Sequence, residues 1–270
     1  MKVSGNACES PGQFFFAVPA CQAGMDGSMK IAIFSDTHTS HRKLRVPDAD
    51  VLIFAGDMTC CRTDREVTDF NDFLRSLPHK YKIVVAGNHD HRLAVDREKA
   101  KSLLSGAIYL QDEAVLVEGI MVYGAPWNPQ LNAYACDAFA LPRGKALKEK
   151  WEMIPKGIDI LVTHVPPSGV LDRNGPVSHG CADLAAVVAT LRPKYHVFGH
   201  MHGRHGVIKF DETSYINCNV QGKNGALRSP LLLDYHSGEI LEIEKSTCRK
   251  ELTKNGKPSR PLINPLALGQ

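Results

Sequence analysis

Short, almost uninterrupted runs of apolar residues recur along the chain, and a polar cluster follows each of them. The runs are Lys30–Phe34, Val51–Ala55, Lys82–Ala86, Ile158–Thr163 and Tyr195–Phe198. Short apolar runs of this kind are typical of strands that are buried on both faces, as in a sheet covered by helices. The pattern therefore predicts an α/β fold with these five strands at its centre.

Helical and hairpin signals fill the intervals between the strands. Thr63 and Glu66 have the spacing of a capping box, which satisfies free N–H groups at a helix start, and Pro78 marks the end of that helix. Further helices are expected at Asp96–Leu104, Lys145–Ile154 and Cys181–Leu191. Turn residues at 118–119, 211–212 and 237–238 predict hairpins, so the second half of the chain should carry more antiparallel sheet.

The polar clusters supply candidate metal ligands. In α/β sheets, ligand sites gather outside the carboxyl ends of the strands, so five strand ends are expected to form one site. Carboxylate, amide and imidazole groups suit hard to borderline metal ions, and a soft thiolate site is disfavoured because no cysteine belongs to the set. The candidate ligands are Asp36, His38, Asp57, Asn88, His164, His200 and His202.

The ligand types favour two ions and a phosphate substrate. Asp36 and His38 are two positions apart and would project from the same side of an extended segment, while Asp57 has two oxygens that can bridge two ions. Two divalent ions carry four positive charges, and two carboxylates with a bridging hydroxide remove three, which leaves about one to attract an anion. Such a pair of ions can activate water and clamp phosphoryl oxygens.

Residues beside the ligands are candidates for catalysis and for substrate binding. His89 lies between Asn88 and Asp90, and adjacent side chains diverge, so His89 should face the substrate, where it would protonate the leaving oxygen or stabilise the transition state. Asp90 is a candidate to orient the His89 ring. Substrate contacts are expected from Asn88, His89, Trp127 and Asn128, and the alternative for the last two is a packed loop.

Composition narrows the class of protein. The 270 residues fit one large domain or two small ones, and the net charge of +3 is mild. A pI near 8.4 is below the basic range typical of dedicated nucleic-acid binders. No apolar run reaches the ~20 residues that span a bilayer. Eight cysteines without a CxxC pair favour free thiols in the cytoplasm rather than secretion.

The two ends of the chain differ from its middle. Residues 1–28 show no helical or strand periodicity, and Met29 directly precedes the first predicted strand, as at the beginning of a domain. Residues 1–28 are therefore expected to be a disordered leader or an over-extended start. The proline-containing stretch 247–270 is expected to be an extended or disordered tail. The domain itself is then expected to cover 29–246.

The motifs resemble a known family. SDTH, GD, GNHD, the histidine at 164 and GHMH occur in the order and spacing of the calcineurin-like metallophosphoesterase signature. The segments YGAPWNP, IPKGIDILVTHVPPSG and RPKYHVFGHMHG are similar to the MPPED subgroup of that superfamily. The resemblance runs from about Met29 to Asp234 and implies a four-layer α/β/β/α sandwich with mixed central sheets and the site at the carboxyl ends of strands.

The resemblance also implies how the ligands divide. One ion would take Asp36, His38, Asp57 and His202, and the other would take Asp57, Asn88, His164 and His200. Some MPPED members have glycine where His200 stands here, so His200 argues for two occupied sites and real turnover. Asp90 follows the GNH motif where many relatives have glutamate, which leaves its orienting role open.

The activity expected from these residues is metal-dependent hydrolysis of a phosphoric ester. A phosphodiesterase acting on cyclic nucleotides or small phosphodiesters is favoured. A phosphomonoesterase with the same centre and a nucleotide-binding protein with vestigial turnover are the alternatives, and a nuclease is disfavoured. Mn²⁺ is the favoured activator, with Fe, Co²⁺, Ni²⁺ or Zn²⁺ also compatible with the ligands. The sequence does not indicate an oligomeric state or the physiological substrate.

Overall fold

Two large mixed sheets form the centre of the protein in a computed structural model that describes residues 15–17, 28–60, 63–130, 137–222 and 225–242. The first sheet has six strands, of which four neighbouring ones run parallel to one another. Across this sheet the order is β17 (Ile240–Glu242), β16 (Leu231–Asp234), β2 (Lys30–Phe34), β3 (Val51–Ala55), β4 (Tyr81–Val85) and β5 (Ile108–Tyr109).

The second sheet has seven strands and again places parallel strands at its centre. Strand β10 lies between β7 and β13 and is parallel to both. Across this sheet the order is β1 (Phe15–Ala17), β6 (Glu113–Val117), β7 (Ile120–Ala125), β10 (Ile160–Thr163), β13 (Tyr195–Phe198), β15 (Thr213–Asn217) and β14 (Gly206–Phe210).

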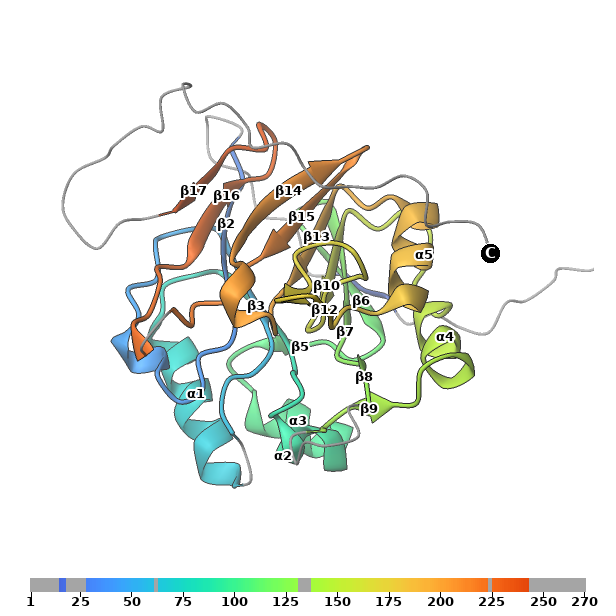
Figure 1. The fold of residues 1–270 in the computed structure, drawn as a ribbon. Coiled ribbons are helices and arrows are strands. Elements are labelled where there is room, and N and C mark those ends of the chain that lie inside the picture. Colours follow the sequence, from blue (N-terminus) through green and yellow to red (C-terminus); the bar gives the residue numbers. More distant parts are fainter. Residues whose placement is uncertain (1–14, 18–27, 61–62, 131–136, 223–224, 243–270) are drawn as a thin grey trace, which may run out of the picture.

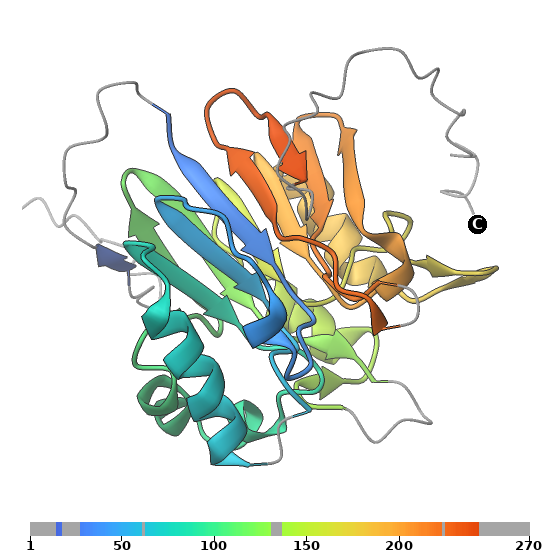
Figure 2. The same cartoon turned by 90° about the vertical axis from the view of Figure 1, so that its left-hand side faces the viewer.

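Helices cover the outer face of each sheet (Figures 1 and 2). Helices α1 (Asp64–Ser76) and α3 (Arg97–Leu103) share an apolar cluster with the six-stranded sheet. Helices α4 (Lys145–Trp151) and α5 (Ala182–Leu191) share another with the seven-stranded sheet. A third cluster fills the space between the sheets. The layers therefore run helix, sheet, sheet, helix, as the resemblance implies.

Alternation along the strands explains why the apolar runs lack polar interruptions. In β3, Ile53 packs between the two sheets, whereas Leu52 and Phe54 pack against the helices. In β10, Val162 packs between the sheets and Leu161 faces α4 and α5. Since both faces of each strand are buried, almost every position must be apolar.

The predicted local signals are largely confirmed. Thr63 caps α1 and forms the reciprocal capping box with Glu66. Asp96 caps α3, and the three predicted turns join β6 to β7, β14 to β15 and β16 to β17. Helix α4 ends at Trp151, three residues before the expected end.

Several short elements have no counterpart among the predicted ones. They are helix α2 (His91–Val95), the 3-10 turns η1 (His41–Lys43) and η2 (His202–Arg204), and the strand pairs β8 (Asn128–Pro129) with β9 (Ala140–Leu141) and β11 (Arg173–Asn174) with β12 (Val177–Ser178).

The ends of the chain fall mostly outside the described residues. Within 1–28, Phe15–Ala17 forms β1 beside β6, and Ser28 is also described. The expected tail, 247–270, lies entirely outside the described ranges. Among the helices that are described, none has the length and apolar character needed to cross a membrane.

One buried histidine gives the fold a pH dependence that can be measured. His196 lies on β13, its Nε2 is 2.9 Å from Thr163 Oγ1, and its Nδ1 has no hydrogen-bond partner. Burial lowers the pKa of His196 to about 3. Below about pH 6.5 this histidine therefore binds a proton in the unfolded chain but stays neutral in the folded chain. The free energy of unfolding consequently decreases as the pH falls from about 6.5 towards 3.

Replacing this ring should flatten the acid side of the stability profile. His196→Phe is expected to recover roughly 2–3 kcal/mol of the stability that wild type loses between pH 7 and pH 4.5. Thr163 Oγ1 keeps its bond to Val165 O, so the hydroxyl stays satisfied. Urea unfolding at several pH values measures this difference. Profiles of wild type and variant that stay parallel would show that His196 does not carry the effect.

Candidate metal centre

Five strand ends from the two sheets bring the predicted ligands together. Strands β2, β3 and β4 of one sheet and β10 and β13 of the other each run directly into a loop that holds at least one ligand. Backbone hydrogen bonds join the loops to one another; Asp36 N, for example, donates to Gly56 O at 2.8 Å. The seven side chains that converge are Asp36, His38, Asp57, Asn88, His164, His200 and His202.

The first group of ligands contains Asp36, His38 and His202. His38 Nε2 and His202 Nε2 are 3.3 Å apart, and His202 Nε2 lies 3.3 Å from Asp36 Oδ1. One ligand atom from each of the three side chains lies within 4.8 Å of the other two. Two ring nitrogens and one carboxylate oxygen therefore converge on a space that suits a single ion.

The second group contains Asn88, His164 and His200. Asn88 Oδ1 lies 2.9 Å from His164 Nε2 and 2.9 Å from His200 Nδ1. His164 Nδ1 is 2.8 Å from Ala55 O. Nδ1 donates to this carbonyl, so Nε2 is the nitrogen that faces the site, and it could ligate an ion once it has lost its proton.

Asp57 lies between the two groups. Its Oδ2 is 3.2 Å from His164 Nε2 and 3.7 Å from His38 Nε2. The carboxylate is almost fully buried. A buried carboxylate that faces side chains of both groups has a position that would suit a bridging ligand, so the residues present fit a pair of ions.

The backbone at the ligands departs from the extended conformation expected for Asp36 and His38. Asp36, His38, Asp57 and His200 all have positive φ angles, between 40° and 66°. The expectation of an extended segment is wrong, because a left-handed turn after β2 brings these side chains together instead. Left-handed non-glycine residues cost of order 1–3 kcal/mol each and gather at functional sites.

Glycines in the ligand loops provide the space for this close approach. A Cβ at Gly56 would lie 2.5 Å from His164 Nδ1, and φ there is +96°. A Cβ at Gly87 would collide with the carboxylate of Asp57, and one at Gly199 would collide with Asp36. The glycine before each of Asp57, Asn88 and His200 is therefore required by packing.

A matched pair of glycine variants separates collision from backbone strain. Gly119 has a similar φ of +82° but open space around its Cβ position. Gly119→Ala is expected to lose about 1–2 kcal/mol of stability from strain alone. Gly56→Ala should lose about 1–3 kcal/mol more from overpacking. Urea unfolding with a chelator present compares the two variants, and equal losses would show that Gly56 is not needed for close approach.

The charges in the site are strongly coupled. Burial opposes a positive charge on His164, but the carboxylate of Asp57 outweighs it and raises the pKa of His164 to about 10. Burial, helped by the nearby charge of His164, lowers the pKa of His200 to about 4. His200 is therefore neutral, whereas an ion that binds His164 through Nε2 would have to displace a proton. Metal affinity should consequently rise with pH.

His89 and Asp90 occupy different positions relative to the ligands. His89 is partly exposed, its Nε2 is 3.9 Å from Asp57 Oδ2, and its ring packs edge-on against His38. Asp90 is fully buried, and its carboxylate accepts hydrogen bonds from the backbone N–H groups of Gly87, Asp57 and Thr59. These contacts fasten the loop after β3 to the loop after β4, and none of them reaches the His89 ring.

Trp127 and Asn128 are held by hydrogen bonds within the protein. Trp127 Nε1 donates to Asp112 Oδ1 at 2.6 Å, and the ammonium of Lys150 lies 4.1 Å from the Trp127 ring centroid. Asn128 Nδ2 donates to Ala138 O at 2.7 Å. The contacts of these two residues run to their own loop and to neighbouring elements, and their role in substrate binding stays a prediction.

A cavity adjoins His200 and His202. Its volume is about 380 Å³, and the β11–β12 hairpin forms one wall. The sequence gave no signal for Arg173 or Arg204, because their positions depend on a hairpin that was not predicted. The lining residues are Arg173, Asn174, His179, His200, Met201, His202, Gly203 and Arg204.

Comparisons with known proteins give matches over most of the chain. Residues 29–204 match the family described as calcineurin-like phosphoesterase. Metallophosphoesterase domain-containing protein 1 of Homo sapiens is 39% identical over 235 residues, covering 77% of this chain and 71% of that protein. A UPF0046 protein of Caenorhabditis elegans is 36% identical over 221 residues, covering 77% of this chain and 75% of that protein.

Solved structures share the fold at low sequence identity. One superposes with a TM-score of 0.62 at 16% identity, covering 81% of this chain and 100% of its own. The protein TT1561 of Thermus thermophilus superposes with a TM-score of 0.53 at 16% identity, covering 79% of this chain and 97% of its own.

Proposed function

Since the chain belongs to the calcineurin-like phosphoesterase family, we propose that it hydrolyses small phosphoric diesters at a dinuclear metal centre. The observation that carries the proposal is the position of Asp57, whose Oδ2 faces His164 on one side and His38 on the other. The proposed ligands of one ion are Asp36, His38, Asp57 and His202, and those of the other are Asp57, Asn88, His164 and His200.

The chain's own residues have distinct roles in this reaction. Two divalent ions, when bound, lower the pKa of water and neutralise charge on the phosphoryl oxygens. The side chains of Asp57 and Asn88 contact residues of the other ligand-bearing loops and so keep these loops in position relative to one another. His89 stands at the partly exposed side of Asp57, so it protonates the leaving oxygen, a contribution typically worth 10²–10⁴-fold in rate. Asp90 supports this step indirectly, because its carboxylate fixes the loop that carries His89.

Net charge is the reason for favouring a diester over a monoester. The centre keeps about one positive charge once its carboxylates and a hydroxide are counted, and a diester carries one negative charge. A monoester carries about two near neutral pH. Arg173 and Arg204, which line the adjoining cavity, are the feature that favours the monoester alternative, since they could meet a second charge.

Hydrolysis of two dye esters tests the choice between these substrates. The Mn²⁺-loaded protein is expected to cleave bis-p-nitrophenyl phosphate with a higher kcat/KM than p-nitrophenyl phosphate. Equal or faster cleavage of the monoester would overturn the diester assignment. If a nucleotide binds tightly to folded, metal-loaded protein while hydrolysis stays at background, the protein is a binding protein with vestigial turnover.

The activating metal is a separate prediction. Oxygen and imidazole ligands accept several first-row ions, and Mn²⁺ is expected to restore the highest rate to chelated protein. A panel of Mn²⁺, Fe²⁺, Co²⁺, Ni²⁺ and Zn²⁺ at equal free concentration measures this. A failure of Mn²⁺ to restore activity that another ion restores would contradict it.

A further inference from the structure

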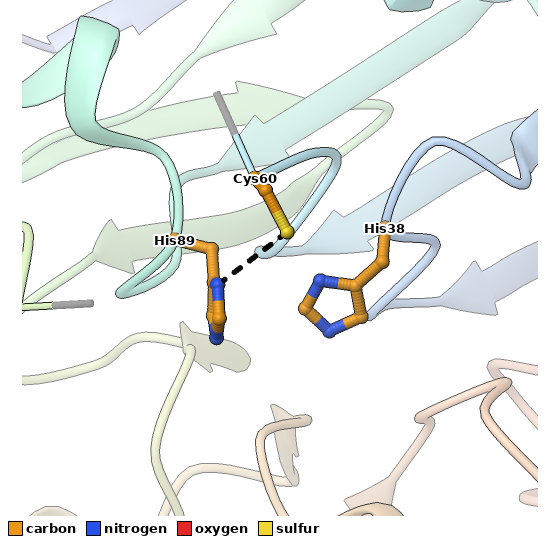
Figure 3. Close-up of side chains that lie close together, drawn as sticks. All are labelled: His38, Cys60 and His89. Atoms are coloured by element: carbon orange, nitrogen blue, oxygen red, sulfur yellow. Dashed lines mark hydrogen bonds between the residues drawn. The ribbon is translucent and has the colours of Figure 1, made fainter. Parts of the chain in front are cut away.

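A cysteine and two histidines meet at the partly exposed side of the metal centre. Cys60 follows β3 and is exposed, whereas His38 and His89 are partly buried. Cys60 Sγ lies 3.8 Å from His89 Nδ1. One ligand atom from each of the three side chains lies within 4.8 Å of the other two, and the side chains point toward one another (Figure 3).

The two imidazole rings face both the dinuclear centre and the thiol. His38 Nε2 is 3.3 Å from His202 Nε2, and its other nitrogen is turned toward Cys60 and His89 (Figure 3). His89 Nε2 is on the Asp57 side, at 3.9 Å from Oδ2, and His89 Nδ1 is the atom nearest the thiol. The nitrogens that face Cys60 are therefore different from those that face Asp57 and His202.

We propose that Cys60, His38 and His89 form a third metal site, which adjoins the dinuclear centre and shares His38 with it, and that this site binds Zn²⁺ and inhibits the enzyme. One thiolate and two imidazoles are a ligand set that zinc accepts, and with three protein ligands a water molecule completes the tetrahedron. Binding sends the thiol proton, and the remaining ring proton of His38, to the buffer. His38 then bridges this ion and the centre.

Ligand chemistry distinguishes this site from the dinuclear centre. The centre offers oxygen and nitrogen only, whereas Cys60 adds a soft sulfur that favours Zn²⁺ over Mn²⁺. A zinc ion on Nδ1 of His89 replaces the proton that the ring needs to become an imidazolium. His89 can then no longer deliver a proton to a leaving oxygen. Inhibition rests on the proposed function, but the existence of the site does not.

The site itself can be tested without any assay of activity. Chelated wild-type protein is titrated with Co²⁺, which gives a near-ultraviolet charge-transfer band when sulfur ligates it. The band is expected only after two equivalents have filled the centre. Cys60→Ser should abolish the band, whereas Cys61→Ser, which changes the neighbouring cysteine, should keep it. Absence of the band in wild type, or its loss in Cys61→Ser alone, would overturn the proposal.

Inhibition is tested on Mn²⁺-loaded enzyme with a cyclic nucleotide as the substrate, because its alkoxide leaving group needs a proton. Each variant is compared with itself at increasing Zn²⁺, so a change in basal rate does not matter. The half-inhibiting Zn²⁺ concentration should rise at least about tenfold in Cys60→Ser, because even indirect partners of a metal are worth 10–100-fold in affinity. It should be unchanged in Cys61→Ser.

The two tests fail in distinguishable ways. Equal zinc sensitivity of wild type and Cys60→Ser would refute the inhibitory role even if the cobalt band is present. Protein that shows the sulfur band but never hydrolyses an ester would refute the proposed function and leave the metal site standing. An unchanged thermal unfolding temperature of metal-depleted Cys60→Ser confirms that the variant is folded.

Discussion

Asp57→Ala is expected to lose both metal ions and to reduce kcat for bis-p-nitrophenyl phosphate by at least about 10⁴-fold, because the metal ions supply most of the rate enhancement. The carboxylate is buried between the two groups of proposed ligands. Its removal would take one ligand from each ion and would remove the negative charge that reduces the repulsion between the two ions. Elemental analysis after gel filtration measures the metals, and the dye ester measures the rate.

A surface carboxylate provides the control for Asp57→Ala. Asp72 is exposed on α1, a position where alanine is well tolerated in a helix. Asp72→Ala should keep two ions per chain and wild-type turnover. If Asp57→Ala is folded and still holds two ions, Asp57 does not bridge them and the ligand assignment is wrong.

His89→Ala is expected to separate chemistry from metal binding. The ring faces Asp57 from the partly exposed side and belongs to neither ligand group, so both ions should stay bound. Loss of a proton donor lowers kcat by about 10²–10⁴-fold, with a smaller change in KM. The loss should also be smaller for leaving groups of low pKa, since those need no proton.

Two further variants make the His89 result specific. His89→Gln keeps a hydrogen-bond donor of similar reach but cannot exchange a proton, so it should stay nearly as slow as His89→Ala. His236→Ala changes an exposed histidine remote in the sequence from the ligand loops and should retain wild-type turnover. Metal analysis that shows an empty ion site in His89→Ala would reassign the residue to metal binding.

The strands, and the convergence of the candidate ligands at their ends, could be predicted from the sequence because their causes are local. An apolar run such as Val51–Ala55 must be a buried strand, and the GD that follows it must lie at the strand end. The capping box at Thr63 and Glu66 is satisfied within a single helical turn. Convergence of five such ends follows from the parallel arrangement of the strands.

The features that sequence did not predict depend on contacts between distant loops. The carboxylate of Asp90 accepts hydrogen bonds from the backbone N–H groups of Asp57 and Thr59, whose position follows from the turn after β3, and its role in orienting His89 stays a prediction. The cavity wall needs the β11–β12 hairpin, which has only two residues in each strand. Cys60 is no member of the dinuclear ligand set, and only the folded loops reveal its two histidine neighbours.

The most direct test of a dinuclear diesterase is the rate of bis-p-nitrophenyl phosphate hydrolysis as a function of Mn²⁺ bound per chain. Chelated protein receives Mn²⁺ in steps, and bound metal and activity are measured on the same samples. Activity should stay low up to one ion per chain, rise with the second, and then level off. Full activity at one ion per chain, or none in folded protein that holds two, would contradict the account.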